Sequence, residues 1–200
     1  MKKSLTVGCV IMASGLSRRF GTNKLLADFC GQPMLCRAFD ATATPGIAAR
    51  IVVTRSENVQ ALCRAHGVPV LLHSLPGRND TVRLGLSALL EQQPELSGCM
   101  FLPGDQPLLR RESVGSLVDF YREHPEHIAA LGHDGVRGNP CLFPARLFPE
   151  LLALQGDHGG NQVIRRHEED LLLWEVPAPE LTDVDTPQVL AQLRRDMAEE

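Results

Sequence analysis

This 200-residue sequence has no long apolar stretch, and each of its apolar runs has only the length of a strand. A membrane-spanning helix needs roughly 20 consecutive apolar residues, so no span is expected. No small-residue cleavage site follows the first apolar run, which argues against a secretion signal. We therefore expect a cytoplasmic protein that does not enter a membrane.

The sequence also lacks CxxC pairs, internal repeats and an excess of positive charge. Its six cysteines are scattered, which disfavours zinc binding and favours buried, reduced thiols. The formal net charge is −4, so bulk electrostatics do not favour nucleic acid as a partner. Any anionic ligand must therefore be met by cations that are concentrated in one place.

What the sequence does have is a regular alternation of short apolar runs and helix-like stretches. Unbroken apolar strands that alternate with helices indicate a mostly parallel sheet covered on both faces. The pattern weakens at 132–149, which we interpret as an excursion over the sheet. The prediction is one α/β domain over residues 1–200, with three layers. The expected strands are Leu5–Ala13, Arg50–Thr54, Pro69–His73, Cys99–Pro103, Ile128–Leu131 and Leu171–Val176, with a broken segment at Pro140–Phe143. The expected helices are Pro33–Ala43, Glu57–Ala65, Thr81–Glu91, Arg111–Arg122, Gly159–His167 and Pro187–Met197.

In such sheets ligands bind at the carboxyl ends of the strands, and the first strand is followed by an unusual loop. Gly15 and Gly21 allow the backbone to approach a ligand with its N–H groups exposed. Arg18, Arg19 and Lys24 bring positive charge to the same loop. This combination favours a cradle for polyphosphate, although the spacing matches neither a Walker A loop nor GxGxxG. The alternative is an ordinary solvated connection.

Carboxylates follow two later segments. Asp105 comes directly after an expected central strand, in "PGDQP", and Asp183 and Asp185 lie in "DVDTP" before the last helix. Carboxylate oxygens at strand ends commonly hold Mg²⁺. The alternative is that these aspartates form a turn or cap a helix.

A third polar segment, "LPGRNDTVRLGL", begins at Leu75. It places Asn79 and Thr81 at a helix N-terminus, where free N–H groups can bind a sugar or a base edge, or where the residues serve only as a cap. The seven histidines are dispersed, and solvent-facing positions explain most of them. We keep only His158, in "GDHGGN", as a candidate for an acceptor site.

Taken in order, these segments resemble the MobA-like nucleotidyltransferases. "IMASGLSRRFGTNKLL" is similar to that family's LAAGxSxRMGxxKLL signature, "PGDQP" to its GDMP motif and "DVDTP" to its D-x-D-T-P motif. "GNPCLFPARLFPELLALQGDHGGNQVI" resembles the GHPxLF…LxGDxGAR stretch of the branch that handles molybdopterin. The resemblance implies a Rossmann-like α/β/α fold of the nucleotide-diphospho-sugar transferase type, with a mostly parallel mixed sheet.

The closest branch of the family is molybdenum cofactor cytidylyltransferase, which joins CMP from CTP to molybdopterin with Mg²⁺ and releases pyrophosphate. By this resemblance the substrates are CTP (or GTP) and a phosphorylated acceptor, with a molybdoenzyme or its chaperone as a partner. The implied roles are catalysis for Arg19, Lys24 and Asp105; nucleotide binding for Ala13, Ser14, Gly15, Arg18, Arg19, Lys24, Arg78, Asn79 and Thr81; metal binding for Asp105 and Asp185; and acceptor binding for Asn139, Asp157, His158 and Gly159.

Some positions depart from the family pattern. Ser14 replaces an alanine or glycine of the first signature, so the base contact of this loop is expected to differ. Asn161 stands where the GAR element has its arginine, and Arg165 or Arg166 are the candidates to compensate.

Two kinds of alternative function remain open. The first is another transfer reaction on the same scaffold, either guanylyl transfer to molybdopterin or cytidylyl transfer to a sugar or polyol phosphate. The second is a nucleotide-binding accessory protein for molybdenum hydroxylase maturation that has lost catalysis.

Overall fold

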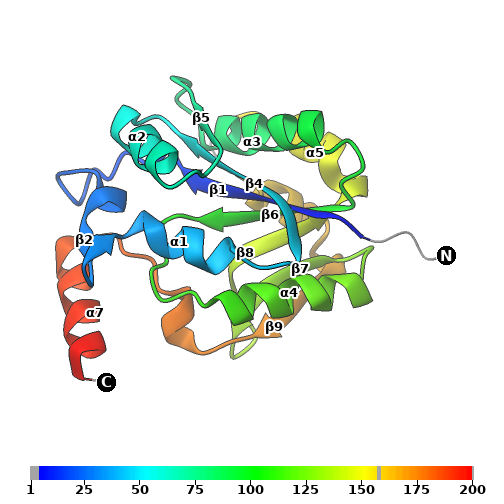
Figure 1. Ribbon diagram of the computed structural model, residues 1–200. Coiled ribbons are helices and arrows are strands. Elements are labelled where there is room, and N and C mark those ends of the chain that lie inside the picture. The colour runs from blue at the N-terminus through cyan, green and yellow to red at the C-terminus, as the bar shows by residue number, and fades with distance from the viewer. Residues whose placement is uncertain (1–4, 157–158, 200) are drawn as a thin grey trace.

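The computed structural model describes residues 5–156 and 159–199, and its centre is a seven-stranded sheet (Figure 1). The strand order is β5-β4-β1-β6-β8-β7-β9, and every neighbouring pair is parallel except the two pairs that β8 makes. This mostly parallel mixed sheet confirms the predicted α/β class. The strands of this sheet are β1 (Val7–Ala13), β4 (Ile47–Thr54), β5 (Val70–Leu72), β6 (Gly98–Pro103), β7 (Ile128–His133), β8 (Val136–Pro144) and β9 (Leu171–Glu175).

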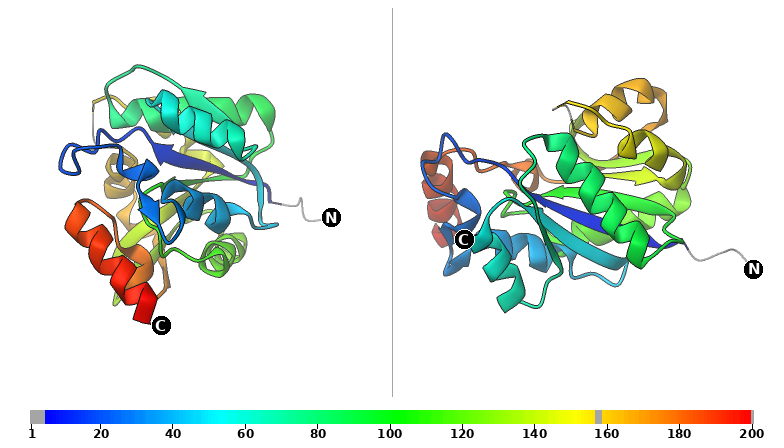
Figure 2. Two further views of the ribbon diagram at one scale, coloured as in Figure 1. Left: turned by 60° about the vertical axis from the view of Figure 1, so that its left-hand side comes forward. Right: turned by 90° about the horizontal axis from the view of Figure 1, so that it is seen from above.

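Helices cover both faces of the sheet. One apolar cluster joins it to α1, α2, α4 and α7, and a second joins it to α3, α5 and α6. Figure 1 shows α3 and α5 on one side of the strands and α1 and α4 on the other, and Figure 2 shows the twist of the sheet between these layers. The helices are α1 (Leu35–Thr42), α2 (Glu57–Ala65), α3 (Arg78–Gln92), α4 (Arg111–Glu123), α5 (Phe148–Leu152), α6 (Asn161–Arg166) and α7 (Pro187–Glu199).

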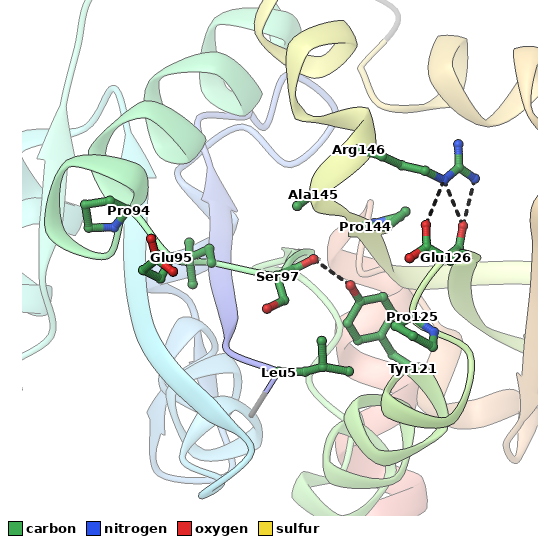
Figure 3. Close-up of a pocket in the computed structure, with 11 residues that line it drawn as sticks. Leu5, Pro94, Glu95, Ser97, Tyr121, Pro125, Glu126, Pro144, Ala145 and Arg146 are labelled. Carbon is green, nitrogen blue, oxygen red and sulfur yellow. Dashed lines mark hydrogen bonds and ion pairs between the residues drawn. The ribbon is translucent and has the colours of Figure 1, made fainter. Parts of the chain in front are cut away.

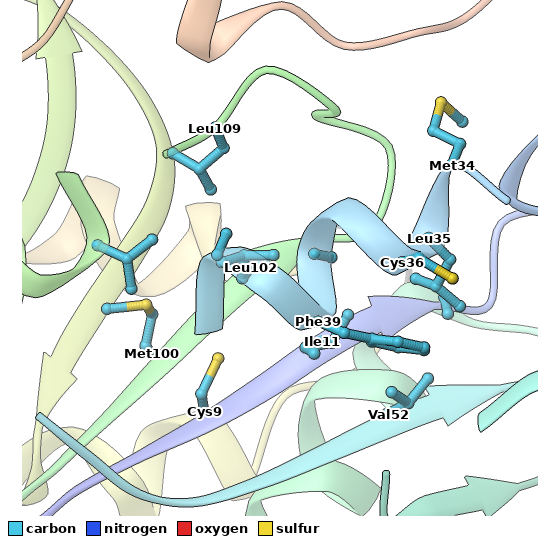
Figure 4. Close-up of a cluster of buried hydrophobic side chains, with 14 of the residues drawn as sticks. Cys9, Ile11, Met34, Leu35, Cys36, Phe39, Val52, Met100, Leu102 and Leu109 are labelled. Atoms are coloured by element: carbon cyan, nitrogen blue, oxygen red, sulfur yellow. The ribbon is translucent and has the colours of Figure 1, made fainter. Parts of the chain in front are cut away.

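The two clusters follow from the alternation of side chains along each strand. On β1, Cys9 and Ile11 point into the cluster on the α1 side, whereas Val10 points into the cluster on the α3 side. Figure 4 shows Cys9 and Ile11 among the buried side chains of the first cluster, near Met100 and Leu102 of β6. Strands that are buried on both faces read as continuous apolar runs, which is why the sequence revealed them.

The interpretation of 132–149 as an excursion over the sheet is wrong. Half of this segment forms β8, which lies inside the sheet between β6 and β7 and runs antiparallel to both. Gly138 and Pro140 interrupt its sequence pattern, because glycine and proline are both depleted in strand interiors. Tertiary pairing therefore overrides the local signal here.

A hairpin and a helix were not anticipated, and several helix and strand boundaries differ from the predicted ones. The short strands β2 (Asp28–Phe29) and β3 (Gln32–Pro33) form a hairpin, and α5 follows β8. The helix expected to start at Thr81 begins at Arg78. None of the helices in the described ranges is long and apolar enough to cross a membrane.

Gly85 marks a close approach between α3 and the sheet. A Cβ atom at this position would lie 2.5 Å from Cγ1 of Val10 and 3.0 Å from Cγ2 of Val53. Gly115 of α4 has room by contrast, since a Cβ there would meet only Oγ1 of Thr44, at 3.4 Å.

Substituting these two helical glycines by alanine should therefore have opposite effects. Gly85→Ala is expected to lower the free energy of unfolding by about 1–3 kcal/mol through overpacking. Gly115→Ala is expected to raise it by up to about 1 kcal/mol, because alanine favours the helix. Urea denaturation of both variants measures the difference, and a gain in both would contradict the close packing of α3 on β1.

Candidate active site

The loop after β1 is held by its own polar side chains. The Ser17 backbone adopts a positive φ of 50°, and its carbonyl oxygen accepts hydrogen bonds from Phe20 N and Gly21 N. The Ser17 hydroxyl accepts a third bond, from Lys24 N at 3.2 Å, and Asn23 caps the short 3-10 helix η1 (Lys24–Leu26) by accepting from Leu25 N. The loop therefore delivers Lys24 to a fixed place at the carboxyl edge of the sheet.

Lys24 lies between two carboxylates that come from distant parts of the chain. Its Nζ is 2.5 Å from Asp105 Oδ2 and 3.1 Å from Asp185 Oδ1, and only 11% of its side chain is exposed. Arg19 Nη2 donates to the other Asp185 oxygen at 2.7 Å. The structure thus brings together four of the predicted residues, the two metal candidates and the two cations named as catalytic.

The two acidic segments are held side by side by backbone and side-chain hydrogen bonds. Val184 N donates to Asp105 O at 2.9 Å, and the buried Gln106 donates from Nε2 to Leu181 O. Val184 itself is fully buried, so Asp183 and Asp185 extend from the other side of the segment. Thr186, and not an aspartate, caps α7 by accepting from Val189 N.

The charges in this cluster shift one another's pKa values. Burial disfavours the charged form of Lys24, but Asp105 and Asp185 outweigh burial and raise its pKa. Partial burial also works against the Asp185 carboxylate, yet Lys24 and Arg19 lower its pKa. Asp183 keeps contact with solvent, but its partial desolvation and then the charge of Asp105 raise its pKa. The two neighbouring aspartates therefore differ in how strongly they hold a negative charge.

The third predicted segment forms the start of α3, beside this cluster. Gly77 N donates to Asp80 Oδ2 at 2.9 Å, so Asp80 caps the helix and its pKa is lowered by this bond and by Arg83. Asn79 and Thr81 are 1% and 3% exposed. Asn79 Nδ2 and Thr81 Oγ1 are buried without a hydrogen-bond partner in the described structure, which leaves polar atoms available for a ligand.

The first loop and the third segment are tied together through Ser14. Arg55 donates from Nε to Ser14 O at 3.1 Å and from Nη1 to the carbonyl oxygens of Leu75 and Pro76. The Ser14 hydroxyl also lies 2.9 Å from His73 Nε2. Ser14, which is expected to contact the nucleotide, is therefore held by Arg55 and His73, two side chains that were not predicted as site residues.

The acceptor segment is joined to the third segment by a hydrogen bond. Gly159 N donates to Asn79 Oδ1 at 2.6 Å, while Asn139 on β8 accepts a weak bond from the Cys141 thiol. The predicted residues Asp157 and His158 lie outside the described residues. Ala13 ends β1 in a buried position, Gly15 and Arg18 are exposed in the loop after β1, and Arg78 is exposed at the start of α3.

Asn161, which stands where the family pattern has an arginine, is hydrogen-bonded to an arginine of β8. Arg137 on β8 donates from Nη2 to Asn161 Oδ1 at 3.0 Å, which places its guanidinium where α6 begins. Arg166, one of the two expected substitutes, instead pairs with Glu150 at 3.5 Å.

Two of the unpredicted residues, Arg55 and His73, could have been found from their positions in the sequence. Arg55 directly follows β4 and His73 directly follows β5, the positions at which an α/β sheet gathers its ligands. His73 is half-buried and hydrogen-bonded, so a solvent-facing role does not describe it. Arg137 could not be found in this way, since it precedes the irregular part of β8.

Two cavities differ in their relation to these residues. One of about 540 Å³ lies beside the start of α3 and is lined by Gly77, Asn79 and Arg83 together with Leu154 and Gly156. The other, of about 380 Å³, lies at the opposite edge of the sheet (Figure 3). There Tyr121 donates to Ser97 O, and none of the predicted site residues lines the cavity.

Comparison with known proteins places this arrangement in a family. The profile of the MobA-like NTP transferase domain matches residues 9–171, which include the cation-rich loop and Asp105. The chain belongs to the MobA-like NTP transferase family. The resemblance noted in the sequence is thereby confirmed.

Two curated relatives of this family member are informative. The 3-deoxy-manno-octulosonate cytidylyltransferase of Neisseria gonorrhoeae (strain NCCP11945) is 30% identical over 111 residues, which are 56% of this chain and 44% of that protein. The chain thus spans less than half the length of that relative. The purine catabolism protein PucB of Bacillus subtilis (strain 168) is 25% identical over 99% of this chain and 100% of its own length.

Solved structures share the fold of this MobA-like chain. Rv0371c of Mycobacterium tuberculosis H37Rv superposes with a TM-score of 0.82 at 24% identity, covering 96% of this chain and 99% of that one. A second Rv0371c structure contains manganese. CMP:2-keto-3-deoxy-manno-octonic acid synthetase complexed with CTP gives a TM-score of 0.76 at 19% identity, covering 97% and 99%.

The opposite pKa shifts of Asp183 and Asp185 predict opposite effects of amide substitution in this MobA-like site. Asp185→Asn should lower the free energy of unfolding at pH 7 by about 1 kcal/mol or less, since this carboxylate is 43% exposed. Asp183→Asn should raise it by a similar amount, about 1 kcal/mol or less.

The two aspartates should also differ in how they change stability with pH. The lowered pKa of Asp185 stabilises the fold above 3.8, the ordinary value, and this contribution is lost as the pH falls through the lowered pKa. The raised pKa of Asp183 costs stability once the pH exceeds 3.8, and the cost is complete above the raised pKa. Both variants should therefore converge on the parent in acid, and urea denaturation from neutral to acid pH measures this. Effects of equal sign would contradict the assigned charges.

Proposed function

We propose that this chain is a cytidylyltransferase that joins CMP from CTP to the phosphate of molybdopterin and releases pyrophosphate. The observation that carries the proposal is the cluster in which Lys24 joins Asp105 and Asp185, with Arg19 on the same carboxylate. It lies at the carboxyl edge of the sheet, next to a glycine-containing loop. Such a site suits a reaction that depends on positioning and fixed charge instead of a protein nucleophile.

The charges of the cluster indicate how it meets a triphosphate. Two cations, Arg19 and Lys24, face two carboxylates, Asp105 and Asp185, and these four charges sum to zero. In the proposed reaction Lys24 and Arg19 orient the phosphates and cover the charge that develops on the leaving pyrophosphate. The acceptor phosphate oxygen attacks the α-phosphorus in line, so no covalent intermediate with the protein is needed.

The two carboxylates also fit a divalent cation. They approach one positive charge, Lys24 Nζ, from two loops, and Mg²⁺ usually takes one or two protein carboxylates and completes its shell with phosphate oxygens and water. No group of three or more His, Cys, Asp or Glu in the described ranges forms a complete metal site, which suits an ion that depends on its nucleotide. When bound, Mg²⁺ would polarise the phosphate oxygens. The manganese complex of the structural neighbour Rv0371c supports a divalent ion at such sites.

The nucleotide would lie between the first loop and the start of α3. The backbone of Ala13, Ser14 and Gly15 faces the triphosphate with Arg18, while Arg78, Asn79 and Thr81 meet the base and ribose. The buried, unpartnered atoms of Asn79 and Thr81 support this assignment, because a ligand would supply their missing hydrogen bonds. The choice of CTP is supported by the cytidylyltransferase relative.

The acceptor would lie toward Asn139, Gly159 and the residues that precede Gly159. The stretch similar to the molybdopterin-handling branch supports molybdopterin, and Arg137 adds a cation at this side of the site. A second candidate is cytidylyl transfer to a sugar acid or sugar phosphate, which the 3-deoxy-manno-octulosonate relative favours.

A panel of nucleotides and acceptors tests the function. CTP and GTP are each combined with molybdopterin, 3-deoxy-manno-octulosonate and a polyol phosphate, with Mg²⁺, and pyrophosphate release is measured. We expect release with CTP and molybdopterin. Release with another pair would reassign the substrate, and tight CTP binding without release on any acceptor would point to an accessory protein.

Within this assay, Lys24→Ala and Asp105→Ala should each reduce turnover on the order of 100-fold or more, because each removes a charge that the transition state needs. Arg122→Ala is the control, since Arg122 pairs with Asp119 on the surface of α4. Circular dichroism verifies that the variants are folded. Normal turnover in either folded variant would refute the assigned roles.

Arg137 is expected to act on the acceptor alone. Arg137→Ala should raise the KM for the acceptor about 10-fold or more, because hydrogen bonds to charged groups contribute roughly 1.5–3 kcal/mol, and should leave the KM for CTP unchanged. Arg166→Ala, which removes a cation already paired with Glu150, is the matched control. Equal changes in both variants, or a change confined to CTP, would exclude Arg137 from the acceptor site.

A further inference from the structure

The partners of the Ser14 hydroxyl determine which atom donates in each of its two hydrogen bonds. The Ser14 hydroxyl lies 3.1 Å from Val53 O and 2.9 Å from His73 Nε2. A carbonyl oxygen only accepts, so the hydroxyl proton serves Val53. The remaining bond then requires His73 to donate from Nε2–H to the Ser14 oxygen. The Ser14 hydroxyl therefore both donates and accepts a hydrogen bond within the protein.

This assignment fixes the state of the histidine. Burial, and then the neighbouring Arg55, lower the pKa of His73, although Asp80 works in the opposite direction. The neutral ring therefore carries its proton on Nε2, and Nδ1 is left as a bare acceptor. Nδ1 is indeed buried with no hydrogen-bond partner in the described structure.

His73 and Arg55 hold the same residue from two directions. His73 N also donates to Thr54 O at 3.0 Å, which fixes the histidine at the end of β5, and Arg55 holds Ser14 O. Arg55 further binds the carbonyl oxygens of Leu75 and Pro76, on the far side of the expected base site. The distance between the first loop and the start of α3 is thus set by side chains that need not touch the nucleotide.

We propose that His73 is a positioning residue for nucleotide recognition, acting through Ser14 to fix the width and polarity of the slot that receives the base. The role rests on the proposed function. While His73 donates to it, the Ser14 hydroxyl is turned away and the loop offers its backbone to the base. Without His73, the Ser14 hydroxyl loses its donor, and of these three contacts Ser14 keeps those to Val53 and Arg55. Discrimination between CTP and GTP then decreases.

The first experiment measures the Kd of CTP·Mg²⁺ and GTP·Mg²⁺ by calorimetry. His73→Ala should weaken CTP binding about 5–10-fold, as expected for the loss of one hydrogen bond, and should reduce the CTP/GTP ratio. His73→Gln should restore most of the affinity, because its amide N–H₂ reaches the place of Nε2, whereas the shorter His73→Asn should not. The kcat at saturating CTP should stay within about 2-fold of the parent, since the reacting phosphates are held elsewhere.

A double-mutant cycle with Ser14→Ala separates an indirect role from a direct one. If His73 acts through Ser14, His73→Ala should cost no further affinity in the Ser14→Ala background. An undiminished cost in that background would overturn the proposal, because His73 would then contact the nucleotide itself or act along another route.

Nitrogen-15 NMR of the imidazole provides a readout that is independent of any ligand. We expect a proton on Nε2 and none on Nδ1, and the opposite tautomer would overturn the proposal. The outcomes also distinguish a failure of the proposed function from a failure of the role of His73. A wild-type protein that binds neither CTP nor GTP would refute the proposed function and this role with it. A wild-type protein that binds CTP, with an unchanged Kd in the His73→Ala variant, would refute the role alone.

Discussion

The Lys24 ammonium, held between the carboxylates of Asp105 and Asp185, is the interaction on which the carboxyl edge of this protein depends. A buried lysine is costly unless its charge is matched, and here two acidic segments supply the match. The contact joins the loop after β1 to the loop after β6 and to the segment before α7. Three parts of the chain that are distant in sequence are thereby fixed around one charge.

The same network explains why the site is ordered. Val184 N bonds to Asp105 O, so the backbone aligns the carboxylates before any ligand arrives. Burial raises the pKa of Asp183, and repulsion by the neighbouring Asp105 charge raises it further. An added divalent ion would relieve this repulsion. In the proposed function, the charges that hold these loops together would also bind a metal-bound polyphosphate.

Beyond the charged cluster, two further groups of contacts lie at the places proposed for the base and the acceptor. Ser14 is tied to His73 and Arg55, and Arg137 takes the place beside Asn161. In the proposed function, these contacts would affect the recognition of base and acceptor and leave the transfer step to the charged cluster.

The sequence by itself determined the α/β class, most strands and helices, and the residues that follow the ends of β1 and β6. A continuous apolar run indicates a strand that is buried on both faces. The glycines, cations and aspartates directly after such runs can likewise be read from the local sequence. Only the tertiary structure decided that β8 enters the sheet, that His73 bonds to Ser14, and that Arg137 reaches Asn161. The physical reason is that these contacts join residues far apart in the sequence. Periodicity reports how a segment is buried, but the partner of a strand or a side chain is chosen by packing across tens of residues, which no local pattern contains.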